Sequence, residues 1–437
     1  MSQNISRFLF IFILFITPAS ALAQQDEYFD PDFLRYENKV YDPNIKTVQL
    51  FRAGWNEAYP VINLNSKEKL HLTFDDLNDN LRNLGYTFIH CNSKWEHSDL
   101  MKIEYLEGIE DNTVLDFGFS STLYQPFVKY DLTFPNTDVR FVKSGNYLLV
   151  VYDQDNDNKI LVSWRFFIAE YFASVSPNIH RPTQAIYRQN SHEVDFTIVQ
   201  SQIDLVQPFS TLKVVVTQNQ NWEGAITDLK PKFINGTKLI YDYDEENIFS
   251  GGNEFRTIDI RNINYNSIST SHIATLDDTI NAYLFPEKPR SSSVYLTSPD
   301  INGHYFLKND DVRFDSDLEL EYMKVHFKLD YPAKLFKADI YIYGQFTGWN
   351  FTDEYKLKWN SDKGRYETDL YIKQGYYNYL YMYKPNDGDA DVSVIEGSHA
   401  QTDNEYSFFI YYREPGQVYD RLIGYSTSVY PVYNLDR

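Results

Sequence analysis

The chain has 437 residues, a formal net charge of −21 at pH 7, and 37 tyrosines and 31 phenylalanines. An acidic surface repels phosphate backbones, which argues against nucleic acid and anionic lipid as partners. The single cysteine, Cys91, has no second cysteine with which to form an internal disulfide, so the fold depends on core burial.

The first 23 residues have the pattern of a cleavable secretory signal peptide. Arg7 precedes an apolar run over residues 8–16, and small residues lead to Ala23, after which we expect cleavage. The run is too short to span a membrane, and no later window reaches the roughly 18 apolar residues that a spanning helix needs. We therefore expect an exported, periplasmic chain without direct membrane insertion.

Apolar and polar residues alternate with a period of two from about residue 45 onward, as is typical of strands with one buried face. Clear examples are Leu70, Leu72 and Phe74; Tyr130, Leu132 and Phe134; Val194, Phe196 and Ile198. Between Asn146 and Ile168 two apolar runs flank DQDNDNK, which predicts a hairpin. No helical period is sustained, so we predict an all-β chain of tandem immunoglobulin-like β-sandwich domains.

Two breaks in the alternation suggest domain boundaries. Residues 174–184 carry two prolines and no alternation, and residues 307–317 form a polar stretch. The predicted division is a signal peptide (1–23), an N-terminal sandwich (24–173), a middle sandwich (174–310) and a C-terminal sandwich (311–437).

Cys91 lies in GYTFIHCNSKWEHSDL, residues 85–100, with His90, Glu96 and His97 nearby. Strand alternation places Cys91 and His90 on opposite faces. Metal sites need converging ligands and a nucleophilic cysteine needs a positioned base, and His97 lies beyond an expected turn. The pattern favours a structural cysteine.

The hairpin tip carries Asp153, Asp155, Asp157 and Asn158, whose alternate oxygens resemble the start of a calcium loop. A full EF-hand loop needs glycine at its sixth position and glutamate at its twelfth, and Asn158 and Trp164 stand there. Aspartate and asparagine are also common turn formers, so we interpret the segment as a turn and leave weak calcium binding open.

The stretch IFSGGNEFRTIDI, residues 248–260, combines paired glycines with a following strand pattern. A phosphate cradle would need a helix at that point, so a structural turn is favoured and a partner contact is the alternative. Glu254 and Arg256 could pair on one strand face. The sequence lacks GxSxG, HExxH, paired CxxC and P-loop motifs, so we expect neither an enzyme nor a cofactor.

Near the C-terminus, IYGQFTGWN and LKWN resemble the immunoglobulin-like early-set modules of the glycogen-binding type. The rings of Trp349 and Trp359 could stack on sugar rings or equally pack under loops. This resemblance supports one alternative function, an exported carbohydrate-binding protein. A secreted enzyme and a cargo protein of a secretion route are less favoured.

Ordered segments across nearly the whole chain carry a second resemblance. They are VQLFRAGWNEAYPVINLNSKEKLHLTFDDL (48–77), YTFIHCNSKW (86–95), QPFVKYDLTFPN (125–136), SGNYLLVVYDQDND (144–157) and GGNEFR (251–256). Together they resemble the plug proteins of the type IX secretion system of Bacteroidota. The resemblance implies a periplasmic, non-enzymatic β protein. It would dock at the periplasmic mouth of a large outer-membrane translocon barrel and fill the pore while no substrate passes.

A tyrosine-rich strand offers a candidate contact surface for that barrel. Tyr377, Tyr379 and Tyr381 alternate within the run from Tyr376 to Tyr383. Tyrosine supplies a large contact area with a polar tip and is enriched at interfaces. We predict that these three side chains bind the translocon barrel, the only macromolecular partner that we expect, beside possible weak calcium or glycan binding.

Overall fold

The computed structural model describes residues 34–431, apart from residues 57, 79 and 311–315. The predicted signal peptide therefore lies outside the described residues. Strands make up 49% and helices 5% of the described residues, which confirms the all-β sandwich class. No helix in the described ranges is long and apolar enough to cross a membrane.

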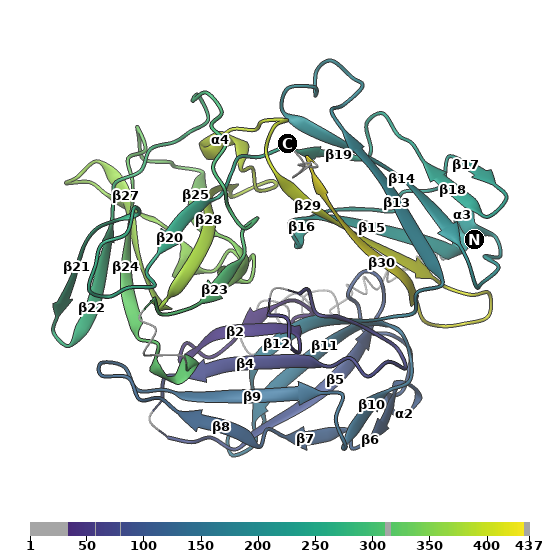
Figure 1. The fold of residues 1–437 in the computed structure, drawn as a ribbon, viewed down its shortest axis with the longest axis horizontal. Helices are drawn as coiled ribbons and strands as arrows, with labels where there is room; N and C mark the ends of the chain where they lie inside the picture. The colour runs from purple at the N-terminus through teal and green to yellow at the C-terminus, as the bar shows by residue number, and fades with distance from the viewer. Residues whose placement is uncertain (1–33, 57, 79, 311–315, 432–437) are drawn as a thin grey trace, which may run out of the picture.

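The described strands form three lobes at the corners of a triangle (Figure 1). Each lobe contains two main sheets that contribute side chains to one core. The chain builds the first lobe, enters the second, forms the third, and returns to the second. The lobes therefore do not follow one another along the chain as three separate consecutive domains.

The first lobe has two facing sheets and a small two-stranded one. The elements are β1 (Lys39–Val40), β2 (Ile45–Arg52), β3 (Val61–Asn63), β4 (Leu70–Asp76), β5 (Leu84–Cys91), α2 (Lys102–Tyr105), β6 (Leu106–Gly108), β7 (Asp111–Thr113), β8 (Asp116–Phe119), β9 (Val128–Phe134), β10 (Val139–Phe141), β11 (Gly145–Asp153) and β12 (Lys159–Ala169). The sheet orders are β1-β12-β11-β5-β7, with β3 parallel to β12, then β2-β4-β9-β8 and β10-β6. The predicted hairpin is confirmed as β11 and β12.

The second lobe combines the middle of the chain with its last two strands. The elements are β13 (Ala173–His180), β14 (Ser191–Gln200), α3 (Pro208–Thr211), β15 (Leu212–Gln218), β16 (Asn221–Thr227), β17 (Phe233–Asn235), β18 (Lys238–Tyr241), β19 (Ile248–Ser250), β29 (Asn404–Tyr412) and β30 (Arg421–Tyr430). One sheet has the order β13-β14-β18-β17, with β19 beside β14, and the other has the order β16-β15-β29-β30.

The third lobe is inserted between β19 and β29. The elements are β20 (Arg256–Asp259), β21 (Thr270–Leu276), β22 (Thr279–Leu284), β23 (Tyr305–Leu307), η1 (Asp317–Glu319), β24 (Tyr322–Leu329), β25 (Ala338–Tyr343), η2 (Gln345–Thr347), η3 (Asp353–Tyr355), β26 (Lys358–Asn360), β27 (Arg365–Lys373), β28 (Gly375–Pro385) and α4 (Ser393–Glu396). Its sheets are β20-β28-β23, with β25 beside β28, and β21-β22-β24-β27-β26.

These pairings correct the predicted division at residue 310. Strands β20 to β23 belong with the C-terminal part of the chain in the third lobe, and β29 pairs with β15 in the second. The partner of each strand depends on which apolar faces pack together in the folded core. A local alternation pattern predicts a strand but does not identify its partner.

The segment 174–184 is also corrected, because most of it is strand β13 rather than a linker. Pro177 lies within that strand, and β13 is at the edge of its sheet. Proline lacks a backbone N–H donor and is tolerated at such edges. Because proline usually argues against a strand, its presence led to the prediction of a linker here.

Candidate functional site

The junction of the first and second lobes is an apolar core of its own. It includes Cys91, Trp95 and Phe167 from the first lobe and Val215, Phe409 and Tyr411 from the second. The Phe167 and Trp222 rings stack with centroids 5.7 Å apart, and Trp222 Nε1 donates to Tyr59 Oη at 2.8 Å. Aromatic contacts of this kind fix the two lobes against each other.

Arg165 lies partly buried among these rings. Its guanidinium carbon lies 4.3 Å from the centroid of Trp95 and 5.8 Å from that of Trp222, and its Nε donates to the Tyr36 carbonyl oxygen at 2.8 Å. Burial lowers the pKa of Arg165 to about 10. The stacked cation therefore joins both lobes through ring faces rather than through a carboxylate.

A buried polar group joins the first and third lobes. Tyr322 Oη donates to Asp75 Oδ2 at 2.7 Å, and Thr47 Oγ1 lies 2.6 Å from the same hydroxyl. Burial raises the pKa of Asp75 and lowers the pKa of Lys373, its ion-pair partner in the third lobe. Desolvation thus opposes the attraction between these charges, and the geometry of the contact must compensate for it.

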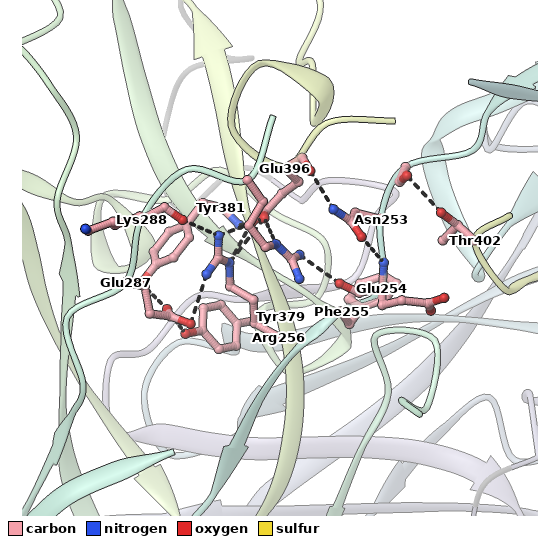
Figure 2. A network of polar contacts seen from close by, with 12 residues as sticks. Asn253, Glu254, Phe255, Arg256, Glu287, Lys288, Tyr379, Tyr381, Glu396 and Thr402 are labelled. Carbon is pink, nitrogen blue, oxygen red and sulfur yellow. Dashed lines mark hydrogen bonds and ion pairs between the residues drawn. The ribbon is translucent and has the colours of Figure 1, made fainter. Parts of the chain in front are cut away.

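The two chain crossings between the second and third lobes are bound to each other. His399 N donates to Gly252 O at 2.9 Å, and Thr402 Oγ1 donates to the same oxygen at 2.9 Å. Asn253 Nδ2 donates to Glu396 O at 2.7 Å (Figure 2). Tyr343 Oη also lies 3.1 Å from Asn221 Oδ1 across this junction. All three lobe junctions are therefore closed by specific contacts.

Figure 2 also shows where the predicted pair of Glu254 and Arg256 ends up. The Arg256 guanidinium binds Glu396 at 2.9 Å and Glu287 at 3.0 Å, and its Nη2 donates to the Lys288 carbonyl oxygen. Glu254 instead accepts a hydrogen bond from Tyr295 Oη. The predicted pairing is wrong, because the two carboxylates that reach Arg256 come from distant segments.

Tyr377, Tyr379 and Tyr381 do not form a contact surface. Their exposed fractions are 2%, 1% and 0%, and all three lie in the core of the third lobe. The hydroxyls of Tyr379 and Tyr381 donate to Glu287 Oε2, and that of Tyr377 donates to the Lys373 carbonyl oxygen. The predicted translocon contact is corrected, because side chains closed to solvent in this way cannot reach a partner.

Cys91 is fully buried, and burial raises the pKa of its thiol to about 12. His90 points into the first-lobe core on the other side of the strand, where its ring lies 4.9 Å from that of Tyr147 and Nε2 bonds the Ser144 carbonyl. The structural interpretation of Cys91 fits this environment, because the thiolate needed by a nucleophile is strongly disfavoured.

The acidic segment at 153–158 is the turn of the β11–β12 hairpin. Asp157 and Asn158 adopt positive φ values of 48° and 55°, and Asp153 Oδ1 accepts a hydrogen bond from Asp155 N at 3.1 Å. Aspartate and asparagine tolerate the left-handed region and cap turns in this manner. Turn formation therefore accounts for these residues.

Both candidate sugar-stacking tryptophans pack against protein rings. Trp349 contacts Tyr343 at a centroid distance of 5.2 Å, and Trp359 contacts Tyr366 at 5.1 Å, each edge to face. Trp349 borders a cleft of about 50 Å³ between the first and third lobes, and a neighbouring cleft of about 250 Å³ is lined by Val48, Trp164 and Tyr305. Both tryptophans are partly buried, and each gives part of its ring surface to a contact within the third lobe.

One group of potential metal ligands was not predicted from the sequence. His180, Glu193 and Asp195 bring ligand atoms within 4.8 Å of one another on strands β13 and β14. Glu193 and Asp195 are two residues apart in a strand, which signals a shared face. His180 stands in the segment predicted to be a linker, so its place opposite Glu193 emerges only from the strand register.

Comparison with known proteins gives a clear relationship. The family model described as type 9 secretion system plug protein, first domain, matches residues 45–170. The crystal structure of a hypothetical protein from Parabacteroides merdae is 31% identical, with a TM-score of 0.87 over 91% of this chain and 100% of that chain. No curated protein matches.

Two further solved structures carry no argument about this chain. They are the partial N-terminal region of an enterococcal surface protein (8% identity, TM-score 0.18, 91% of this chain and 96% of that chain) and trypsin-activated alpha-2-macroglobulin from Escherichia coli (10% identity, TM-score 0.18, 88% of this chain and 23% of that chain).

Proposed function

Because this chain belongs to the type 9 secretion system plug protein family, with a role in type IX secretion at the cell envelope, we propose that it closes the translocon. In this proposal the periplasmic protein occupies the mouth of the large outer-membrane barrel while no substrate is passing. The observation that carries the proposal is the family match to residues 45–170, which spans the first lobe from β2 to the end of β12.

The closed lobe junctions support this role. A pore wide enough for folded cargo leaks unless a body of fixed shape fills it, and the three lobes are joined through buried rings, a buried ion pair and paired chain crossings. Because these contacts are buried, separating the lobes would expose apolar surface and unpaired polar groups. Contacts of this kind oppose movement of one lobe against another, which supports the plug proposal.

With the β28 tyrosines buried, the barrel contact must use other side chains, and β8 is the best candidate surface. Leu115, Phe117, Phe119 and Leu123 are 75%, 44%, 59% and 85% exposed. β8 is an edge strand within the matched segment and lies on the outer side of the first lobe (Figure 1). Exposed apolar residues on a strand edge are typical of binding surfaces.

The test is affinity purification of tagged chain from gently solubilised outer membranes of the native host, with mass spectrometry of what accompanies it. We expect one very large β-barrel subunit with the wild-type protein. Recovery of the protein alone from soluble periplasm would overturn the plug proposal and direct attention to glycan screening.

Two matched variants test the β8 contact surface separately from the plug role. The double variant F117S/F119S should lose the barrel subunit, while F233S/I234S, on the exposed edge strand β17, should retain it. Both variants are checked for native circular dichroism. If folded F117S/F119S still recovers the barrel, the plug role stands and β8 is excluded as the contact.

A further inference from the structure

Three potential metal ligands converge on one face of the β13–β14 pair in the second lobe. His180 on β13 is paired directly with Glu193 on β14, and Asp195 follows two residues later. Directly paired residues and residues two apart along a strand share a face. His180 Nε2 accordingly lies 3.0 Å from Asp195 Oδ2 and 3.8 Å from Glu193 Oε1.

Neighbouring groups fix the histidine and the glutamate in this arrangement. His180 Nδ1 lies 2.9 Å from the Arg181 carbonyl oxygen, so Nδ1 carries the donated hydrogen and Nε2 keeps its lone pair in the neutral ring. Thr183 donates from its backbone N and its Oγ1 to Glu193 Oε2 at 2.7 and 3.1 Å. The other glutamate oxygen is left to face the histidine.

The aspartate is held in the same way. Tyr243 N and Asn247 Nδ2 donate to Asp195 Oδ1 at 3.2 and 2.9 Å, which leaves Oδ2 facing His180. Asn247 is 1% exposed, and its Oδ1 accepts no hydrogen bond within the described part of the chain. Metal ligands are commonly oriented by outer hydrogen bonds of this kind.

The lone pairs that remain on these three side chains are available to bind a cation. Glu193 is 1% exposed, and none of the hydrogen bonds among the described residues reaches its Oε1. A proton on His180 Nε2 satisfies Asp195 at 3.0 Å, but 3.8 Å is too long for a hydrogen bond to Glu193. An ion at the centre would satisfy all three atoms together.

We propose that His180, Glu193 and Asp195 bind a divalent transition-metal ion, with Zn²⁺ the best match. An imidazole nitrogen with two carboxylate oxygens suits Zn²⁺ better than Ca²⁺, which prefers oxygen ligands alone. Ligand atoms around tetrahedral Zn²⁺ lie about 3.4 Å apart, so the observed separations need only small side-chain movements. His180 is 32% exposed, which leaves room for water as a further ligand.

The site would fasten strand β13 to β14, and through Thr183 it would fasten the segment that follows β13. The test uses metal-free protein carrying no polyhistidine tag. Calorimetric titration with ZnCl₂ should give one-to-one binding, and the melting temperature should rise with added Zn²⁺. Added Co²⁺ should give visible absorption bands.

H180A and D195N should weaken Zn²⁺ binding at least 100-fold, and T183V should weaken it about 10–100-fold. The matched control is H71A, since His71 bonds a single carboxylate, Asp131, at 2.9 Å and should leave Zn²⁺ affinity unchanged. H180N replaces H180A if that variant fails to fold. If the wild-type protein binds Zn²⁺ no more tightly than H180A or H180N, the proposal is overturned. A proton on His180 Nε2 then accounts for the contact with Asp195.

Discussion

Lys373 Nζ lies 2.7 Å from Asp75 Oδ2, and this contact ties the third lobe to the first with side chains only 1% and 2% exposed. Replacing Lys373 with methionine leaves the Asp75 carboxylate buried without its cation. Loss of one partner of a buried pair usually costs about 3–5 kcal/mol. We expect K373M to lower the free energy of unfolding by that amount in urea titrations.

The exposed pair of Lys94 and Asp228, 4.0 Å apart across the first and second lobes, is the matched control. K94M should change stability only slightly, because exposed pairs contribute little. The double variant D75N/K373M should cost less than the sum of its single changes, since neither charge is then left alone. Equal losses for K373M and K94M would show that burial of the first pair is unimportant.

Cys91 should be unreactive in the folded protein. Its side chain is closed to solvent and its thiol pKa is raised to about 12 by burial, so the thiolate is scarce at pH 8. We expect no labelling by a thiol-specific reagent until the protein unfolds, and one thiol per chain in guanidinium. Rapid labelling of native protein would restore the reactive interpretation.

C91A should keep the docking function and cost about 1 kcal/mol in packing. The small loss follows from removing one sulfur atom from the junction core of the first two lobes. Loss of docking in folded C91A would contradict a purely structural role.

Asp420 should make the protein sensitive to acid. Burial alone would raise its pKa, but hydrogen bonds from Arg413 and Ser93 and the charge of Lys213 lower the pKa of Asp420 to about 2. The unfolded value is about 4, so this stabilisation is complete above pH 4 and disappears as the pH falls to about 2. D420N should lower the free energy of unfolding at pH 7 by about 2 kcal/mol, and the melting temperature should fall accordingly.

The difference in melting temperature between D420N and the wild type should shrink as the pH is lowered from 5 toward 3. Asp420 joins the second lobe to Ser93 of the first, so the loss reflects a lobe junction. A difference that stays constant across this range would show that the ionised carboxylate contributes nothing.

The sequence pattern predicted strands well where one face is buried and the other solvated, as in the β11–β12 hairpin. It failed at Tyr377, Tyr379 and Tyr381, because tyrosine suits both an exposed contact and a core. These hydroxyls find internal acceptors, which the strand pattern does not disclose. Alternation shows which residues share one face of a strand, but it does not show whether that face is buried or exposed.

Long-range pairing was the second limit of the sequence. β15 and β29 pair across nearly 200 residues, from Leu212 opposite Tyr412 to Gln218 opposite Tyr406, and no local signal announces that partner. The metal-ligand group depends on register in the same way, since His180 meets Glu193 only when β13 and β14 align. Pairing of this kind is settled by tertiary packing.

Glu254 should lower stability as the pH rises, opposite in sign to Asp420. Burial is the main cause that raises its pKa to about 7, and the nearby carboxylates of Asp300 and Asp403 raise it further. The unfolded value is about 4.3, so folding favours the protonated form. Stability is therefore unaffected below pH 4, falls as the pH rises through 7, and then levels off.

E254Q mimics the protonated side chain and keeps an oxygen that accepts from Tyr295. Its melting temperature should equal that of the wild type near pH 4.5 and exceed it by several degrees at pH 8. E246Q, at an exposed glutamate, is the control for the loss of one carboxylate charge. If E254Q is instead less stable than wild type at pH 8, the ionised carboxylate is favoured in the folded state and the argument from burial fails.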